Sequence, residues 1–337
     1  MRRLVRLIHL AALLCAGPLF AADAPNQALT VDHIQPAYAR LAAASAALRA
    51  RVDAFCAAPG GDALNAVQHT HAPAFLAWQG VQHIRVGPVQ LFMREFRFQL
   101  WPDKRGSVGR HLQRLIAEAD PAALAPQRFA TGSVAVQGFS AFEQLIHDPA
   151  MARFDDPGFA PRCRVLRAIA ANLDSMAAEL DRAWRIPEAS AALAGDGTAA
   201  LVAVHTQLER ILTQKLDLPL GSDLAHARGR RAEAWRSGLS RAAIGENLAA
   251  VATVYRLALR PRLADAALGR EIDAAFAVAH TALDALAMPL PAAVADPAAR
   301  AQVEALRAAV SQLKALVSQR LAPALGLSLG FNSLDGD

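Results

Sequence analysis

Apolar residues recur along most of the chain at the three- and four-residue spacing of amphipathic helices, and no convincing pair of strands appears. Proline and glycine divide this pattern into separate helical segments. Much of the 54% hydrophobic content is alanine, the strongest helix former, whereas aromatic residues make up 6%. The pattern predicts an all-α protein, with helices at residues 28–57, 62–85, 88–99, 106–118, 132–148, 161–185, 197–217, 229–259, 264–286 and 297–321.

The stretch from residue 186 to residue 197 interrupts the helical pattern most clearly. Pro187, Gly195 and Gly197 lie there among small residues. Each side retains enough chain for a bundle of about four helices. We therefore expect two helical-bundle domains packed side by side, the first at residues 23–190 and the second at residues 191–337.

The N-terminal residues are typical of a secretory signal peptide. Arg2, Arg3 and Arg6 precede an apolar run at residues 7–14, and small residues follow up to Ala22. The run is too short for a permanent membrane anchor. We expect a signal peptide at residues 1–22, cleavage after Ala21 or Ala22, and a periplasmic protein without a stable transmembrane anchor.

The charge of the chain changes once this segment is set aside. The formal net charge is +5, and three of the positive charges belong to the signal peptide. Arg230, Arg231 and Arg236 lie in a basic cluster, but Glu233 lies among them and no aromatic stacking platform accompanies them. The cluster therefore favours a solvated or ion-paired helix face, and we expect no nucleic-acid partner.

Two cysteines follow the signal peptide. An oxidising compartment permits a disulfide between Cys56 and Cys163, and the alternative is two separate thiols.

The segment at residues 132–148 separates into a polar and an apolar side when it is drawn as a helix. Gln137, Ser140, Glu143, Gln144 and His147 share one side, and apolar residues fill the other. The polar side either faces water or lines a cleft. A glycine inside a helix costs up to about 1 kcal/mol relative to alanine, so Gly138 on the apolar side predicts a close contact with another segment.

The letters GFSAFEQ at residues 138–144 resemble the GxHxxE motif of the imelysin family. Similar segments occur in the expected order at WPDKR (101–105), SVAVQG (133–138), KLDLPLGSDL (215–224), AEAWRSGLS (232–240) and GFNSLDGD (330–337). The resemblance implies an exported protein of two helical bundles. It further implies a link to iron uptake and to the metallopeptidases among which the family is filed.

In that motif a histidine and a glutamate lie three residues apart, as suits a pair of metal ligands. Here Glu143 retains the glutamate, whereas Ser140 stands at the histidine position, and a hydroxyl is a poor ligand for iron or zinc. His147, one turn beyond Glu143, restores a His/Glu pair by its spacing. The metal would be iron or another divalent ion. The alternative is that His147 serves as a C-terminal capping cation.

Other segments that resemble the family extend the candidate ligand site. WPDKR contributes Trp101 and Asp103, with capping of the next helix as the alternative role of Asp103. Glu233, Arg236, Ser237 and Ser240 share one face of the expected helix at residues 229–259, with an ion pair inside the helix as the alternative. The candidate ligand-binding residues are Gly138, Ser140, Glu143, Trp101, Asp103, Glu233, Arg236, Ser237 and Ser240.

Three functions are consistent with these features. The first is an exported, non-catalytic binding protein that works with iron-uptake components of the cell envelope. The second is a metal-dependent peptidase, which needs about three ligands and a general base, and no HExxH motif supplies them. His69 and His71 diverge by about 200° on a helix and share a metal only if Pro73 breaks that helix. The third is a docking scaffold without a small ligand.

Overall fold

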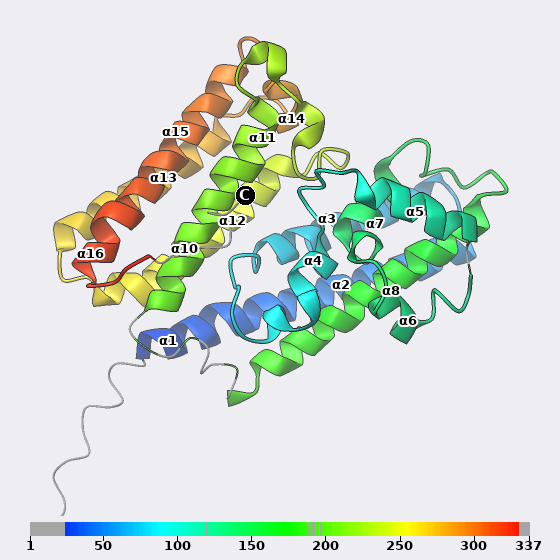
Figure 1. Cartoon of the computed structure of the whole chain (residues 1–337), viewed down its shortest axis with the longest axis horizontal. Coiled ribbons are helices and arrows are strands. Elements are labelled where there is room, and N and C mark those ends of the chain that lie inside the picture. The colour runs from blue at the N-terminus through cyan, green and yellow to red at the C-terminus, as the bar shows by residue number, and fades with distance from the viewer. Residues whose placement is uncertain are drawn as a thin grey trace, which may run out of the picture.

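Every regular element in the described part of the chain is helical, so the all-α prediction is confirmed. The helices form two groups, α1–α8 and α10–α16, which meet where α3 contacts α12 (Figure 1). None of the helices described is both long enough and apolar enough to cross a bilayer. The computed structural model describes residues 24–118, 120–187, 189, 193, 195 and 197–329, and the expected signal peptide lies outside them.

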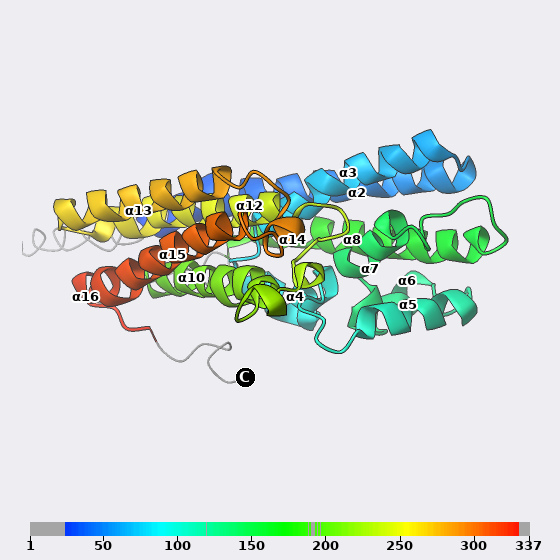
Figure 2. The same ribbon diagram turned by 90° about the horizontal axis from the view of Figure 1, so that it is seen from above.

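The first group is organised around the antiparallel pair α2 and α8. A disulfide joins Cys56 near the end of α2 to Cys163 near the start of α8, with the Cα atoms 5.8 Å apart. At the opposite ends of these helices the rings of Tyr38 and Trp184 stack, with centroids 5.9 Å apart. Seen from above, α3 and α2 lie on one side of this group and α5 and α6 on the other (Figure 2). The α-helices are α1 (Ala24–Leu29), α2 (Gln35–Ala57), α3 (Gly61–Gln79), α4 (Arg94–Phe98), α5 (Ser107–Glu118), α6 (Pro126–Ala130), α7 (Phe139–His147) and α8 (Phe159–Trp184), with a π-helical turn η1 (Thr30–Ile34) and 3-10 turns η2 (Gly87–Met93) and η3 (Val134–Val136).

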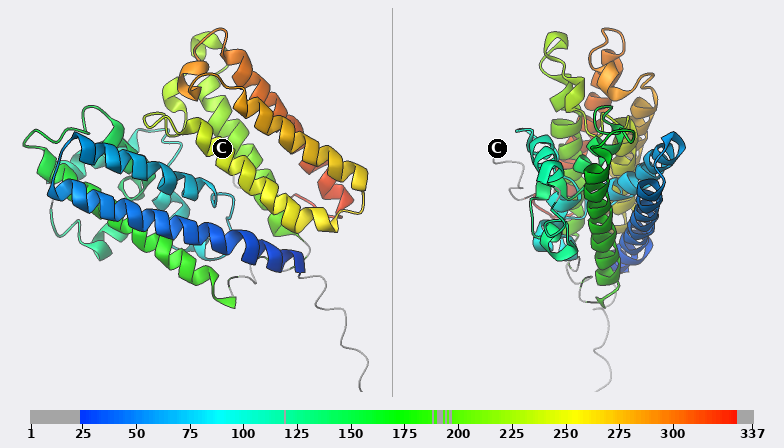
Figure 3. Two further views of the ribbon diagram at one scale, coloured as in Figure 1. Left: turned by 180° about the vertical axis from the view of Figure 1, so that it is seen from behind. Right: turned by 90° about the vertical axis from the view of Figure 1, so that its right-hand side faces the viewer.

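The second group contains four long helices and several short turns. α13 and α15 pack against each other, and α10 contacts both α12 and α15. From behind, α12 and α13 lie in front of this group (Figure 3). The α-helices are α10 (Thr198–Arg210), α11 (Asp217–Leu220), α12 (Ser240–Val254), α13 (Ala266–Asp284), α14 (Leu290–Ala293), α15 (Arg300–Leu316) and α16 (Ala322–Ala324), with π-helical turns η4 (Ile211–Leu216), η7 (Tyr255–Leu259) and η9 (Val317–Leu321) and 3-10 turns η5 (Leu224–His226), η6 (Gly229–Arg231) and η8 (Arg260–Arg262).

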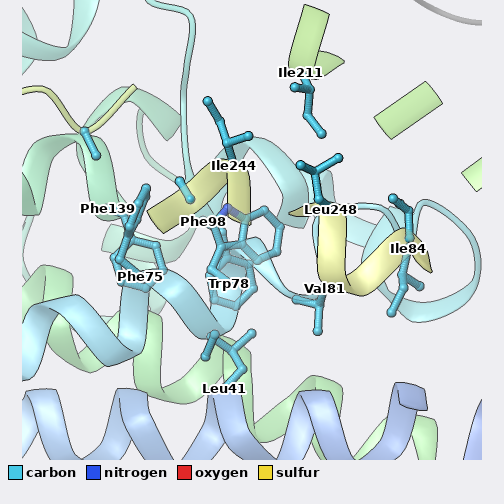
Figure 4. Packing of buried hydrophobic residues seen from close by; sticks show 14 of the residues in the cluster. Leu41, Phe75, Trp78, Val81, Ile84, Phe98, Phe139, Ile211, Ile244 and Leu248 are labelled. Atoms are coloured by element: carbon cyan, nitrogen blue, oxygen red, sulfur yellow. The ribbon is translucent and has the colours of Figure 1, made fainter. Parts of the chain in front are cut away.

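The buried apolar side chains of the two groups form one continuous cluster. At its centre the rings of Trp78 and Phe98 stack with centroids 4.6 Å apart. Ile244 and Leu248 of α12 are drawn beside this stack, and Ile211 of η4, a member of the same cluster, lies further out (Figure 4). A division into domains after residue 190 therefore stays a prediction, and of residues 188–196 the structure describes only three.

Two of the expected helices are interrupted, and each interruption coincides with a left-handed backbone conformation. The helix expected at residues 88–99 breaks before α4, where Phe92 has φ of 58°. The helix expected at residues 229–259 is wrong in its first part, because Ala234 has φ of 50° and α12 starts only at Ser240. A side chain in this conformation is strained, so such positions do not continue a helix.

The helix expected at residues 132–148 is also divided. Gly138 is extended, and α7 begins at the next residue. A Cβ atom at Gly138 would lie 2.1 Å from the carbonyl oxygen of Phe98. The close contact expected at this glycine is therefore present, but it is made by extended backbone just before α7.

Candidate functional site

A cavity of about 400 Å³ lies between the two groups of helices. The first group contributes residues from α3, α7, the start of α5 and the chain between α4 and α5. The second group contributes the connection that precedes α12 and one residue of α11. The lining residues are His71, Phe75, Gln99, Leu100, Trp101, Pro102, Asp103, Lys104, Val108, Phe139, Ser140, Glu143, Gln144, Leu218, Arg230, Arg231, Ala232, Ala234, Trp235 and Arg236.

Glu143 links the two sides of this cavity. It lies on α7, and its Oε1 accepts hydrogen bonds from the backbone nitrogen of Ser237 at 2.8 Å and from the Ser237 hydroxyl at 2.7 Å. No hydrogen bond to Oε2 is present within the described part of the chain. Burial raises the pKa of Glu143, while the bonds from Ser237 and the charge of Arg236 oppose that rise. The cavity therefore contains a buried carboxyl group with one oxygen available to a ligand.

Ser140 and Gly138 position the part of the cavity wall that is formed by the chain between α4 and α5. The Ser140 hydroxyl donates a hydrogen bond to the carbonyl oxygen of Leu100 at 3.0 Å. Gly138 lets the backbone at Phe98 approach α7. Both residues thus position the chain between α4 and α5 along one side of the cavity, and Ser140 also lines it.

The two candidates from WPDKR both line the cavity. The carboxylate oxygens of Asp103 accept hydrogen bonds from the backbone nitrogens of Ser107 and Val108, each at 2.8 Å. Asp103 therefore satisfies backbone donors at the start of α5, as the capping alternative predicts. Trp101 contributes an aromatic face beside it.

Arg236 lines the cavity, and the alternative of an ion pair between it and Glu233 is wrong. Because this segment is not helical, the two side chains point to different partners. The Arg236 guanidinium pairs with the carboxylate of Asp148 at 3.2 Å and lies 4.3 Å from the ring centroid of Trp235.

Glu233 and Ser240 lie behind the cavity in a buried polar network. The side chains of Glu233 and Lys215 form an ion pair, and each is only 1% exposed. Lys215 also donates to Gln79 Oε1 at 2.7 Å, and Glu233 Oε1 accepts from Gln99 Nε2 at 2.9 Å. The Ser240 hydroxyl donates to the carbonyl oxygen of Glu233. This network joins α3, η4 and the connection before α12, and neither Glu233 nor Ser240 lines the cavity.

His71 lines the cavity and is absent from the residues expected to form it. It is 1% exposed, and neither ring nitrogen has a hydrogen-bond partner among the described residues. Burial lowers its pKa to about 3. The burial of His71 could have been predicted from its spacing, because it shares the apolar face of α3 with Val67, Phe75 and Trp78. An imidazole on such a face is buried whenever the helix packs.

His147 ends α7 beside His71, with the two ring centroids 5.3 Å apart. It does not line the cavity, and burial lowers its pKa to about 4. The imidazole is therefore neutral near pH 7, so the capping-cation interpretation is wrong. Pro73 does not interrupt α3, and the exposed His69 points elsewhere and contacts the carbonyl oxygen of Asn65.

The donor atoms of the cavity suit part of a metal coordination sphere. Its wall offers the Glu143 carboxyl group, whereas Asp103 is committed to the backbone of α5 and both ring nitrogens of His71 are buried. Within the described ranges, no three His, Cys, Asp or Glu side chains come together as a group able to hold a metal ion. A metal bound here would be held by Glu143 and would keep further ligands that the lining does not supply.

The fold and the cavity define a class of all-helical protein in which a buried carboxyl group lies between two groups of helices. The Imelysin family model matches residues 34–317, and the chain therefore belongs to the imelysin family.

Two solved structures share this fold. An imelysin-like protein from Psychrobacter arcticum is 24% identical, with a TM-score of 0.77, and the alignment covers 92% of this chain and 98% of that one. A candidate iron-regulated protein A precursor from Parabacteroides distasonis is 13% identical, with a TM-score of 0.71 and coverage of 92% and 95%. No curated protein matches the chain.

Proposed function

We propose that this protein is an exported binding protein that takes an iron-bearing ligand in the cavity around Glu143. It would act without catalysis, in concert with iron-uptake components of the cell envelope. Membership of the imelysin family supports this proposal, as does the similarity in fold to the Parabacteroides distasonis protein, which is described as iron-regulated. The N-terminal sequence supports export to the periplasm.

The observation that carries the proposal is the state of the Glu143 carboxyl group. It is 8% exposed, yet it lines a cavity large enough for a small ligand. Ser237 fixes Oε1, which leaves Oε2 without a hydrogen bond among the described residues. Oxygen ligands of this kind suit iron, and a bound metal ion would stabilise the charged carboxylate against the cost of its burial.

Titration calorimetry of the metal-stripped mature protein with ferrous, ferric and zinc ions tests this proposal. The ferric ion is supplied as its nitrilotriacetate complex to keep it in solution. The Glu143→Gln variant removes the charge while its side-chain oxygen still accepts the Ser237 bonds. Glu304→Gln is the matched control, because Glu304 is an exposed residue of α15 that pairs with Arg300. His147→Ala tests the second residue of the expected His/Glu pair.

We expect saturable iron binding that is lost in Glu143→Gln and retained in Glu304→Gln. Equal binding by the wild type and Glu143→Gln would refute a role for this carboxylate. Hydrolysis of a fluorogenic peptide that requires both the metal and Glu143 would refute the non-catalytic role and support the peptidase alternative.

A further inference from the structure

The wall of the cavity carries more positive than negative charge. Lys104, Arg230, Arg231 and Arg236 all line it. Two acidic residues of the lining oppose them, and Asp148 pairs with Arg236 from outside the lining. One of the two, Asp103, accepts two backbone hydrogen bonds at the start of α5. Glu143 is thus the only carboxyl group of the lining with an oxygen that accepts no hydrogen bond from the described residues. Such a wall favours an anionic ligand over a bare divalent cation.

The Trp235 ring contacts two of these arginine side chains. The Arg236 guanidinium lies 4.3 Å from its ring centroid, and that of Arg230 lies 5.4 Å from it. The sequence predicts a basic cluster without an aromatic partner, and these two contacts correct that expectation. A guanidinium held against an aromatic face keeps its planar set of donors for a carboxylate. Arg230 and Arg231 are exposed and form the rim of the cavity.

The donors of the deeper wall lead to the same kind of ligand. Glu143 alone cannot complete the coordination of a metal ion, and both ring nitrogens of His71 are buried. A metal bound to Glu143 must therefore bring other ligands with it. A small polycarboxylate can provide those ligands and still present carboxylate groups to the arginines of the rim.

We propose that the cavity binds its metal as an anionic complex with a small polycarboxylate, with the metal toward Glu143 and the carboxylates toward Arg230 and Arg231. This inference rests on the proposed function and specifies its ligand. The cavity of about 400 Å³ lies within the size range of small-molecule sites.

Calorimetry with three probes tests the inference: gallium(III) citrate, citrate alone and ferrous ion without citrate under anaerobic conditions. Gallium(III) replaces ferric ion because it does not change oxidation state. The test variant is Arg230→Gln/Arg231→Gln, whose altered side chains are exposed and leave the core intact. Arg228→Gln is the matched control, since Arg228 is an exposed arginine of the same connection that does not line the cavity.

We expect gallium citrate to bind more tightly than citrate alone. The double variant should raise the dissociation constant of the complex on the order of tenfold or more, because charge-assisted hydrogen bonds are lost. Arg228→Gln should leave that constant unchanged. Binding of ferrous ion should be unchanged or stronger in the double variant, because two positive charges have been removed.

The outcomes separate the two proposals. If ferrous ion binds and depends on Glu143 while gallium citrate does not bind, this inference fails and the proposed function stands. If gallium citrate binds equally well to the wild type and the double variant, or no more tightly than citrate alone, the inference also fails. If none of the metal probes binds, both proposals fail.

Discussion

The protein should lose less stability in mild acid when His71 is replaced by leucine. The imidazole is 1% exposed and faces the rings of Phe75, Phe139 and Phe142 at centroid distances of 5.8, 6.1 and 5.5 Å. The titratable group beside it is His147, at 5.3 Å. A proton on His71 would therefore be buried among apolar rings next to a second imidazole. This is why its pKa falls from 6.5 to about 3.

The size of the effect follows from these two pKa values. In the unfolded chain the imidazole binds a proton as the pH falls below 6.5, whereas in the folded protein it stays neutral until about pH 3. The unfolded state thus binds more protons, so stability is greatest above pH 6.5 and falls as the pH decreases. When the pH falls from 7 to 5, this single group therefore lowers the free energy of unfolding by about 2 kcal/mol.

Urea unfolding of the metal-stripped protein at pH 7 and pH 5 measures this quantity. The change in packing caused by His71→Leu is the same at both pH values, so it cancels when the two losses are compared. His69→Gln is the control, because His69 is exposed and two residues away on α3. The variant should lose about 2 kcal/mol less than the wild type over this range. Equal losses in the two proteins would show that the burial of His71 does not depress its protonation.

Three further predictions concern buried or cross-linked groups. Lys215→Met should lower the free energy of unfolding by about 3–5 kcal/mol, because it leaves the buried Glu233 carboxylate without its cation, and a loss below 1 kcal/mol would contradict this reasoning. Glu143→Gln should be more stable than the wild type at pH 7. Because the pKa of Glu143 is raised in the folded protein, the wild type loses stability as the pH rises above 4.5. The advantage of Glu143→Gln in the free energy of unfolding must therefore vanish below that pH. Reduction of the Cys56–Cys163 disulfide, which links positions 107 residues apart, should lower stability by about 4–5 kcal/mol in the chain-entropy picture, and an unchanged unfolding midpoint in reductant would contradict it.

The fold was predictable where a helix buries a regular apolar face. The segments expected at residues 161–185 and 264–286 correspond to α8 and α13 to within two residues at each end. Trp184 is completely buried at the end of α8. Local spacing was sufficient in these helices because the apolar positions continue without interruption.

The connection before α12 was not predictable in the same way. Its sequence has helical spacing, but Glu233 is bonded to Lys215 and Gln99, which lie on other elements. These contacts between distant parts of the chain outweigh the local preference for a helix and leave Ala234 with a positive φ. The same interactions bring Ser237 to Glu143, so the departure from helical structure builds the site.

The polar side of α7 illustrates a second limit. Residue spacing assigned Gln137 to the same side as Ser140 and Glu143, with solvent or a cleft as the alternatives. In the structure Gln137 is completely buried, with its amide nitrogen bonded to the carbonyl oxygens of Phe129 and Gly132. A polar stripe shows only that hydrogen-bonding groups share a face, and partners elsewhere in the chain decide whether water, a ligand or the protein satisfies them.

The central claim is that the Glu143 carboxylate contacts the metal of a ligand held in the cavity. A crystal structure of the iron-loaded protein, with anomalous diffraction recorded on both sides of the iron absorption edge, tests it most directly. We predict one strong iron peak within about 2.5 Å of Glu143 Oε2, inside the cavity between α7 and the connection before α12. An iron peak away from the cavity, or a loaded protein whose iron has no contact with Glu143, would contradict the account.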